Sequence, residues 1–444
     1  MRACTLAARI IGVCGAALGA VPAPAVAGAR HVPSEYATIN MALDASASGD
    51  TVLVAPGTYT DWDARDLGTG ATWTSCAFLV DGVVLRSTHG PAQTVIDMVA
   101  APPPQRFVVL SLFNQSDVTA VEGFTITADP LGGTGVFMTG ELRLSGCIFR
   151  DLDAGNSSGG GIAANGDLRV EDCEFLNCVG SALGGGAISH WLGRIELVRS
   201  VIRQCGNRAV ELNGTSPVTE TALVEDCAFL DNWGGSAAGL GFDSYAGEVI
   251  VRRCTFVRNV AHGTGAGGLG ISNYAPTLVE DCLFVENRTD GDNGQGGAMS
   301  VTGQPSAIVR NCTFVDNSQT YTGIGGSTLH FKSSATLSNC IIAGSAGHVA
   351  IYVDPGSFLT TTCNVFWDNP WGIGIPLSAT DLQADPLFCS PDTGDFTLAE
   401  NSPCLPAQTP CGQIGAFGQG CTGISVDPVS WARLKGLFRG RTEP

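Results

Sequence analysis

The sequence LVEDCLFVEN at residues 278–287 is repeated closely as LVEDCAFLDN at 223–232 and more loosely as IVRNCTFVDN at 308–317. A cysteine stands fifth in each copy, and equivalent positions can be followed along most of the chain. The members of this column are Phe124, Cys147, Cys173, Ser200, Cys227, Cys254, Cys282, Cys312, Cys340 and Cys363. They are separated by 23, 26, 27, 27, 27, 28, 30, 28 and 23 residues, a period near 27. Such a repeat predicts a solenoid in which each repeat forms one coil and stacks on the next.

A second column lies two residues after the first and is aromatic or aliphatic. Its members are Phe149, Phe175, Ile202, Phe229, Phe256, Phe284, Phe314, Ile342 and Val365. Alternation with a period of two predicts a strand with both columns facing inward. Each buried phenylalanine then stabilises the fold by roughly 1.5–3 kcal/mol. We expect the thiols of the first column to be free and to pack as small hydrophobic groups. No Cys-x-x-Cys pair or neighbouring histidine suggests a metal site there.

An asparagine column follows five residues after the cysteines, at Asn232, Asn259, Asn287 and Asn317. Asparagine suits a turn, so this column marks one corner of each coil. Cys178 and Cys205 hold the same corner in two earlier coils. Stacked strands lie about 4.8 Å apart, within the range that a disulfide accepts. The pair is therefore a candidate bridge.

Glycine-rich stretches such as GGGAIS (184–189) and GQGGAMS (294–300) each precede a further apolar strand. With the strand before each tight turn, every coil has three short strands. The two turn residues alternate between acidic and basic from coil to coil. They are Glu171-Asp172, Val198-Arg199, Glu225-Asp226, Arg252-Arg253, Glu280-Asp281 and Arg310-Asn311. Stacking would place opposite charges side by side, which fixes the register of the coils.

The composition restricts the classes of partner. The 444 residues carry a net charge of −18, which argues against binding nucleic acid or an anionic membrane. Residues 1–29 read as a secretory signal peptide, with two arginines before an apolar run at 10–21 and small residues after it. No later apolar stretch is long enough to span a bilayer. We expect a secreted, extracellular or cell-surface chain that is monomeric and has no transmembrane segment once processed.

Three strands per coil and a 27-residue period resemble the right-handed parallel β-helix of pectate-lyase-like proteins. The coils with Phe-x-x-Asn at 229–232, 256–259, 284–287 and 314–317 are similar to the repeats of polymorphic outer-membrane proteins. The resemblance covers about residues 32–420 and implies an all-β solenoid. We divide the chain into an N-terminal cap and first strand (30–60), coils (61–370), a closing rung with a disulfide-rich cap (371–421) and a tail (422–444).

Both ends of the solenoid follow this resemblance. In residues 32–59, Ile39, Ala42 and Leu43 at helical spacing predict a short helix that plugs the N-terminal end, before a first strand at 51–54. Residues 384–404 resemble the closing rung of secreted β-helices. Four cysteines cluster in and just after this segment, and we expect two disulfides among Cys389, Cys404, Cys411 and Cys421. Four cysteines allow three connectivities.

The tail departs from the outer-membrane family, which continues into a long β-barrel. Here SWARLKGLFRGRTEP follows the cap. Trp431, Leu434 and Phe438 lie at helical spacing, with basic residues around them. We consider a sorting or surface-attachment signal, a flexible tail and a docked short helix as its alternatives.

Enzymes of the resembling family act on the outer face of the first strand of each coil. The outward positions here are Ser189, Glu211, Gly241, Gly270, Ser300, His330 and Tyr352, and next Asn213, Asp243, Ser272, Thr302, Lys332 and Asp354. A hydrolase needs two or three carboxylates close together. Glu211 and Asp243 fall on neighbouring coils but are offset along the strand. The motifs of polygalacturonases, pectate lyases and pectin methylesterases are missing, so we assign no catalytic residue.

The strongest polar cluster is His330, Lys332, Tyr352 and Asp354 on adjacent coils. It is either a surface pair of Lys332 with Asp354 beside a tyrosine, or a glycan subsite with Tyr352 as a stacking platform. The loop at 287–297 offers Asp290, Asp292 and Asn293 as oxygen ligands for Ca²⁺, although their spacing matches no complete calcium loop. A solvated loop is the simpler interpretation, and we assign no metal site or cofactor.

Three functions remain. The first is a non-catalytic protein for adhesion that binds an extracellular glycan or protein ligand along its side. The second is a polysaccharide lyase or glycoside hydrolase acting on extracellular polysaccharide. The third is a structural spacer. A carboxylate cluster on the outer face of the first strands would favour the second, and the sequence does not supply one.

Overall fold

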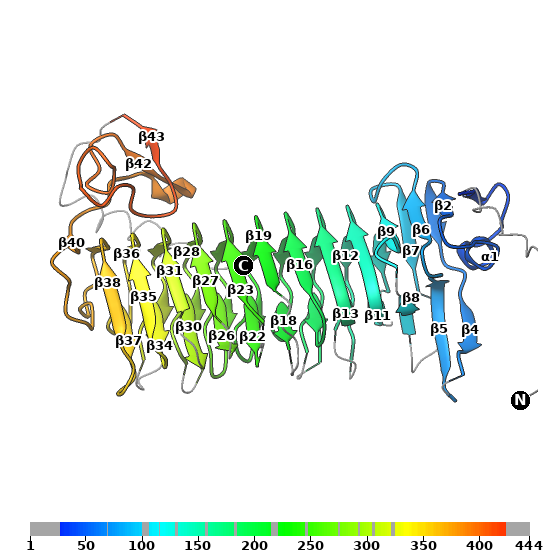
Figure 1. The fold of residues 1–444 in the computed structure, drawn as a ribbon, viewed down its shortest axis with the longest axis horizontal. Coiled ribbons are helices and arrows are strands. Elements are labelled where there is room, and N and C mark those ends of the chain that lie inside the picture. The colour runs from blue at the N-terminus through cyan, green and yellow to red at the C-terminus, as the bar shows by residue number, and fades with distance from the viewer. Residues whose placement is uncertain are drawn as a thin grey trace, which may run out of the picture.

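The chain folds into an elongated parallel β-solenoid with a small additional lobe on one side near its C-terminal end (Figure 1). The computed structural model describes residues 27–68, 70–99, 106–114, 116–128, 132–155, 159–181, 184–214, 221–244, 247–273, 276–291, 294–303, 307–320 and 325–422. The proposed signal peptide therefore lies almost entirely outside the described residues, as does nearly all of the tail. The domain boundaries given above stay predictions.

The strands that carry the Cys-x-Phe pattern form one continuous parallel sheet. Among the described residues this sheet has 13 strands. They are β3 (Gly57–Tyr59), β7 (Thr94–Asp97), β10 (Thr125–Thr127), β12 (Ile148–Arg150), β14 (Glu174–Leu176), β17 (Val201–Arg203), β20 (Ala228–Leu230), β24 (Thr255–Val257), β28 (Leu283–Val285), β32 (Thr313–Val315), β36 (Ile341–Ala343), β39 (Val365–Trp367) and β40 (Leu382–Gln383). Partners in the middle of the sheet are 27 residues apart, as Val201 with Ala228, so the predicted period is confirmed.

The other two strands of each coil belong to a second large sheet. The first-strand column holds β5 (Thr72–Phe78), β8 (Arg106–Asn114), β11 (Thr134–Ser145), β13 (Ile162–Glu171), β15 (Ile188–His190), β18 (Val210–Asn213), β22 (Leu240–Asp243), β26 (Leu269–Asn273), β30 (Met299–Gly303), β34 (Leu329–Phe331) and β37 (Ile351–Val353). Strand β4 (Asp63–Asp66) pairs with β5 in antiparallel fashion. This column forms the face that we describe below as the candidate site.

The second-strand column of the same sheet holds β1 (Ala29–Val32), β2 (Thr51–Val54), β6 (Val84–Ser87), β9 (Ala120–Glu122), β16 (Ile195–Val198), β19 (Ala222–Glu225), β23 (Val249–Arg252), β27 (Thr277–Glu280), β31 (Ala307–Arg310), β35 (Ala335–Ser338) and β38 (Leu359–Thr362). The long strands β11 and β13 run through both columns. A small parallel sheet at the asparagine corner joins β21 (Trp233–Gly234), β25 (Val260–Ala261), β29 (Arg288–Thr289) and β33 (Ser318–Gln319).

Stacked phenylalanines fill the interior beside the thiol column. The rings of Phe229 and Phe256, and of Phe256 and Phe284, have centroids 4.7 and 4.6 Å apart and are almost parallel. The thiols beside them are buried and free, as expected. The thiol of Cys282 donates to the Glu280 carbonyl at 3.1 Å, as its counterparts do on other coils. The column is therefore a packing element with weak local hydrogen bonds.

The column prediction fails at its last member. Ile341 pairs with Val365 and Ile342 with Phe366, so the last interval is 24 residues and Asn364 takes the inward position. Asn364 is buried and its Oδ1 accepts from the Cys340 amide at 3.0 Å. Cys363 lies in the turn with a φ of 60° and forms a disulfide. The assignments of Cys363 and Val365 to the inward columns were wrong by one residue.

The asparagine corner is a continuous hydrogen-bonded ladder. Asn259 Nδ2 donates to the Phe229 carbonyl at 2.9 Å and to Asn287 Oδ1 at 2.8 Å. Its own Oδ1 accepts from the backbone amide of Asn232 at 3.1 Å. These side chains are fully buried, so each satisfies backbone groups that the turn would leave without partners.

The alternating charges at the tight turn pair as predicted. Arg253 contacts Glu225 and also Asp226, at 2.8 Å from Nε to Oδ1. Arg310 contacts Glu280 one coil further on, at 2.5 Å. The arginines are half exposed, so each pair is worth little singly, and the pattern serves register more than stability.

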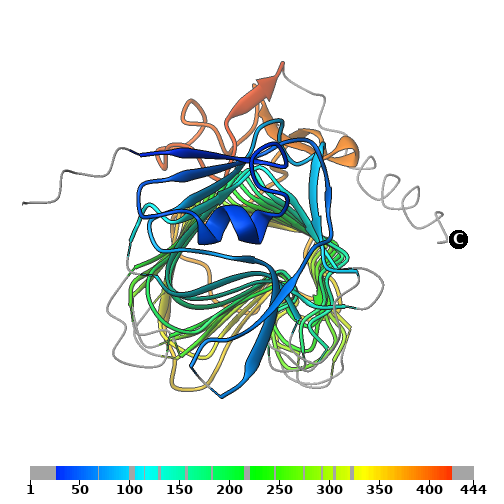
Figure 2. The same ribbon diagram turned by 90° about the vertical axis from the view of Figure 1, so that its right-hand side faces the viewer.

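The N-terminal plug is the helix α1 (Ile39–Asp44), which lies across the open end of the solenoid (Figure 2). Thr38 caps it, since its hydroxyl accepts from the Met41 amide at 3.2 Å. Ile39, Ala42 and Leu43 are buried against the first coils, as their spacing predicts. The helix closes an interior that would otherwise expose apolar side chains.

The C-terminal lobe packs on the outer face of the 13-stranded sheet and builds a second apolar core there. It holds β41 (Phe388–Ser390), the 3₁₀ helix η1 (Pro391–Thr393), β42 (Asp395–Ala399) and β43 (Gln419–Cys421). Its Phe388, Phe396 and Leu398 pack against outward side chains of the sheet such as Ile341 and Val365. We call this lobe the cap.

The disulfides differ in part from the expectation. Cys389 pairs with Cys421 inside the cap, and Cys411 pairs with Cys363 of the last coils. Cys404 is buried and free, so placing both bridges among the four cap cysteines was wrong. Cys178 and Cys205 are also free, and each thiol donates to a backbone carbonyl instead. The missed partner, Cys363, had been assigned to the inward column.

Candidate functional site

The outward face of the first-strand column carries the rows that the sequence predicts. Ser189 pairs with Glu211, Glu211 with Gly241, and Gly241 with Gly270. Further along, Gly270 pairs with Ser300, Ser300 with His330, and His330 with Tyr352. The apolar residues between these positions point into the core. Alternation along each strand therefore brings the corresponding positions of seven coils, five of them polar and two of them glycine, onto one face.

A groove of about 360 Å³ runs along this face. Gly270, Ser272, Ser300 and Thr302 are among the small residues that line it, and Arg208, Asp243, Gln295 and Lys332 supply its charged and amide groups. The groove can therefore hold an extended polar chain and offer it both hydrogen-bond donors and acceptors.

Glycine is required at position 270 because a loop crosses close to it. A Cβ atom there would lie 2.6 Å from the Cβ of Ala237, which belongs to the loop before β22. That distance is far below a normal carbon–carbon contact. The glycine lets the loop approach and fixes one wall of the groove.

Arg208 organises one end of the groove. Its Nη1 contacts Glu211 Oε1 at 2.8 Å and also the carboxylate of Asp243, and its Nε donates to Ser236 Oγ at 2.8 Å. Glu211 and Asp243 are offset by two positions along neighbouring strands, as predicted, but the guanidinium joins them. Arg208 lies before β18, outside the strand alternation, with a φ of 65°. The period therefore gave no signal for it.

Glu211 is the most unusual carboxyl group on this face. Its side chain is 7% exposed, and Oε2 has no hydrogen-bond partner within the described residues. Burial raises the pKa of Glu211 above its ordinary value, while Arg208 and Asn213 act in the opposite direction and Asp243 adds to the rise. Such a carboxyl can hold a proton at a higher pH than an exposed one.

His330, Tyr352 and Asp354 come together as the sequence predicts, but the pairing differs. His330 Nε2 lies 2.8 Å from Asp354 Oδ1, and the His330 and Tyr352 rings meet edge to face at 5.1 Å. Lys332 makes no ion pair with a described residue and reaches the groove instead, so the expected pair of Lys332 with Asp354 is wrong. Burial lowers the pKa of His330, and Asp354 opposes the shift.

The loop considered for Ca²⁺ is only partly described. Asp290 accepts from His262 Nδ1 at 2.8 Å and from Arg288 Nη2 at 3.1 Å, so both its oxygens are engaged. Asp292 and Asn293 lie outside the described residues. Within the described part of the chain, no group of three or more histidine, cysteine, aspartate or glutamate side chains is arranged to hold a metal ion. The choice between a solvated loop and a calcium site there stays untested.

Sequence comparison identifies one family. The model of the right-handed β-helix region matches residues 110–256 and 239–385, which together span 110–385 and hence more than half of the chain. No curated protein matches the chain by sequence. None of the described helices has the length and hydropathy needed to cross a membrane.

Several solved structures align with most of this chain at low sequence identity. The family 6 alginate lyase AlyGC shares 14% identity at a TM-score of 0.49, over 82% of this chain and 54% of its own. Pectate lyase Pel9A shares 14% at 0.41, over 85% and 90%. The A-module of the Azotobacter vinelandii mannuronan C-5 epimerase AlgE4 shares 12% at 0.30, over 78% and 95%. The chain spans about half of the length of AlyGC.

Proposed function

Because the chain belongs to the right-handed β-helix family, we propose that it is an extracellular protein that binds a polysaccharide without cleaving it. The single observation that carries the proposal is the groove on the outward face of the first strands, where small residues lie between Arg208, Asp243 and Lys332. A groove that runs across several coils suits a linear polymer, since each coil adds a further contact at a regular spacing.

The groove chemistry supports a sugar ligand. Hydroxyl groups both donate and accept hydrogen bonds, and the groove offers Ser300 and Thr302 as both, Lys332 as donor and Asp243 as acceptor. Tyr352 is half-buried in the next coil and presents an aromatic ring on which a sugar ring can stack. Its contact with His330 fixes the orientation of that ring.

The test is binding to a panel of pectic, alginate and neutral polysaccharides, measured by gel retardation and calorimetry. Lys332→Ala and Tyr352→Ala should each weaken binding about five- to thirty-fold, which corresponds to roughly 1–2 kcal/mol of lost contact. Thr336→Ala is the control, because Thr336 lies on β35 in the other strand column. Equal binding by all three variants and the parent chain would contradict the proposal.

A second candidate function, cleavage of a polysaccharide, is favoured by one specific observation. Glu211 is buried, has a raised pKa and lies beside the half-exposed Asp243, and a protonated carboxyl near an ionised one can act as an acid–base pair. Arg208 holds both carboxylates, so such a role would require the substrate to displace part of this contact.

Product release separates the two functions. New reducing ends or unsaturated sugars from any polysaccharide, abolished by Glu211→Gln, would establish an enzyme and exclude non-catalytic binding. Retention of a polysaccharide without product, in buffer with and without Ca²⁺, would support the binding protein. Neither retention nor product would favour a protein ligand or a spacer.

Location and assembly belong to the same proposal. The N-terminal sequence reads as a signal peptide, and the two disulfides fit an oxidising compartment such as the extracellular space. We propose a secreted or surface-held monomer. Fractionation of the producing cell together with the mass of the mature chain tests this.

A further inference from the structure

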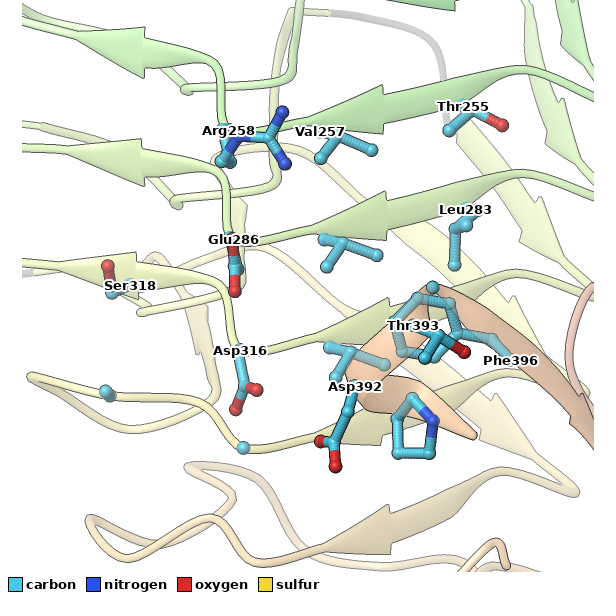
Figure 3. A pocket seen from close by; sticks show the side chains of 16 residues that line it. Thr255, Val257, Arg258, Leu283, Glu286, Asp316, Ser318, Asp392, Thr393 and Phe396 are labelled. Atoms are coloured by element: carbon cyan, nitrogen blue, oxygen red, sulfur yellow. The ribbon is translucent and has the colours of Figure 1, made fainter. Parts of the chain in front are cut away.

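A second groove, of about 700 Å³, lies between the outer face of the 13-stranded sheet and the cap, on a different sheet from the candidate site. Its floor is formed by outward side chains of β24, β28 and β32, including Val257, Leu283, Val285 and Val315 (Figure 3). Phe396 and the 3₁₀ helix η1 of the cap form its other wall. We call this the cap groove.

The floor continues an apolar surface that the cap covers further along. Leu283, Val285 and Val315 are buried and belong to the same apolar cluster as Ile341 of the sheet and Phe396 of the cap. Val257, at the far end, is only partly buried. The cap therefore leaves the last part of its own binding surface open to a further apolar group.

The rim of the cap groove is acidic. Glu286 and Asp316 succeed one another at the turns of neighbouring coils, and Asp392 faces them from the cap (Figure 3). Within the described residues, Glu286 and Asp392 form no ion pair. Arg258 also lines the groove, but its guanidinium is held by Asp231 at 2.6 Å. A segment that fills this groove should therefore present apolar side chains to the floor and positively charged side chains to the acidic rim.

The chain itself contains such a segment. Residues 431–441 read WARLKGLFRGR, with four basic and no acidic residues, in a chain of net charge −18. Trp431, Leu434 and Phe438 are spaced i, i+3 and i+7, the spacing with which an amphipathic helix places its anchors in an apolar groove. We infer that residues 431–441 dock in the cap groove of their own chain.

The connection is long enough. The described chain reaches Thr422, directly after β43, which pairs with β42 beside the groove-lining Phe396. Trp431 follows Thr422 by nine residues, which can span at most about 30 Å. Phe396 lies three residues from the β42 end that pairs with Cys421, about 10 Å along the strand. Attachment to the cap therefore keeps the segment at a high local concentration near the groove.

The test is photocrosslinking in the full chain, with p-benzoylphenylalanine in place of Phe438. We expect crosslinks within one chain, mapped by mass spectrometry to strands β24 and β28 or to residues 391–396. Val257→Glu should reduce their yield at least five-fold. Leu230→Glu is the matched control, since Leu230 holds the same outward position one coil earlier and outside the groove. It should leave the yield unchanged.

A second measurement keeps the inference falsifiable if Val257→Glu misfolds. Glu286→Arg changes only the exposed rim and should also lower the crosslink yield, and raising the salt concentration should lower it in the parent chain. Crosslinks to other surfaces, crosslinks only between two chains, or a mature chain that ends before Trp431 would each overturn the inference. None of these outcomes depends on whether the chain binds a polysaccharide.

Discussion

His190 is a fully buried titratable group inside the solenoid. Its Nε2 donates to the Gly166 carbonyl at 2.8 Å, because a carbonyl can only accept, and Nδ1 has no partner within the described residues. Burial lowers the pKa of His190 from 6.5 to about 4, against the smaller effects of Gly166 and Asp167. Charging this residue in the folded chain is therefore unfavourable.

This shift predicts a pH dependence of stability. Between pH 6.5 and about 4, His190 is protonated in the unfolded chain but stays neutral in the folded chain. The contribution of neutral His190 to the free energy of unfolding should therefore be fully present above pH 6.5. As the pH decreases from 6.5 to about 4, the free energy of unfolding should decrease by on the order of 3 kcal/mol. Urea unfolding across this range should show a flatter dependence in His190→Gln than in the parent chain. His89→Gln, at an exposed position, is the control. Parallel curves for His190→Gln and the parent chain would refute the assignment.

At the same scale, the residues of the candidate site were only partly predictable. Alternation placed Glu211, His330 and Tyr352 outward because strand positions obey a period of two. Arg208 obeys no such period, since it lies in the loop before its strand, and the pairing of Asp354 with His330 rather than Lys332 depends on side-chain reach. Neither the position of Arg208 nor the partner of Asp354 can be predicted from the spacing of residues in the repeat.

At the scale of one element, a single substitution in the asparagine ladder should lower the stability of the fold strongly. Asn259→Ala would leave the Phe229 carbonyl and the Asn232 amide buried without their partner. We expect a loss of about 2–4 kcal/mol in the free energy of unfolding, since each unsatisfied buried group costs about 1–3 kcal/mol. Denaturant unfolding measures it.

Asn311→Gly serves as the control, because the Asn311 side chain bonds Asp281 at the half-exposed tight turn and glycine accepts the φ of 53° at this position. That substitution should cost less than about 1 kcal/mol. Similar losses for the two variants would show that the ladder contributes no more than an ordinary surface contact.

The elements themselves followed from the repeat. The register of the Cys-x-Phe strands was predicted up to Cys340, where coil after coil repeats one pattern of inward residues. It failed at Cys363, because the last interval has one residue more and an asparagine replaces the thiol. Sequence similarity between two cysteines was misleading where the coil length changes.

At the scale of the whole molecule, the cap and the solenoid share one apolar interface. One disulfide, Cys363–Cys411, links the two parts, and the other, Cys389–Cys421, closes a loop inside the cap. Replacing Cys389 and Cys421 together by serine opens a loop of 32 residues inside the cap. The cap should lose roughly 3–4 kcal/mol of local stability. Its release would expose Leu283, Val315 and Ile341, so binding of an apolar dye and cleavage by protease within 391–421 should both increase.

Cys404→Ala is the control for this prediction, because Cys404 is buried in the cap but forms no bridge. It should leave both disulfides in place. If the double variant and the parent chain bind equal amounts of dye and resist protease equally, the apolar contacts alone hold the cap. The sequence predicted a cap with two disulfides but not the surface that the cap covers. That surface is formed by outward apolar residues, and within the repeat these look like exceptions to the alternation of inward apolar and outward polar positions.

The free thiols inside the solenoid also bear on how the chain matures. Eleven described cysteines are free and four are bridged, and mispairing among so many would have a very large number of outcomes. The four bridging cysteines all come at or after position 363, whereas every free thiol except Cys404 comes at or before position 340. Domains and repeats fold from the N-terminus as the chain emerges. Coil-by-coil burial would thus shelter the early thiols from oxidant before the late cysteines appear, and the order of translation would act as the chain's own guide to correct oxidation.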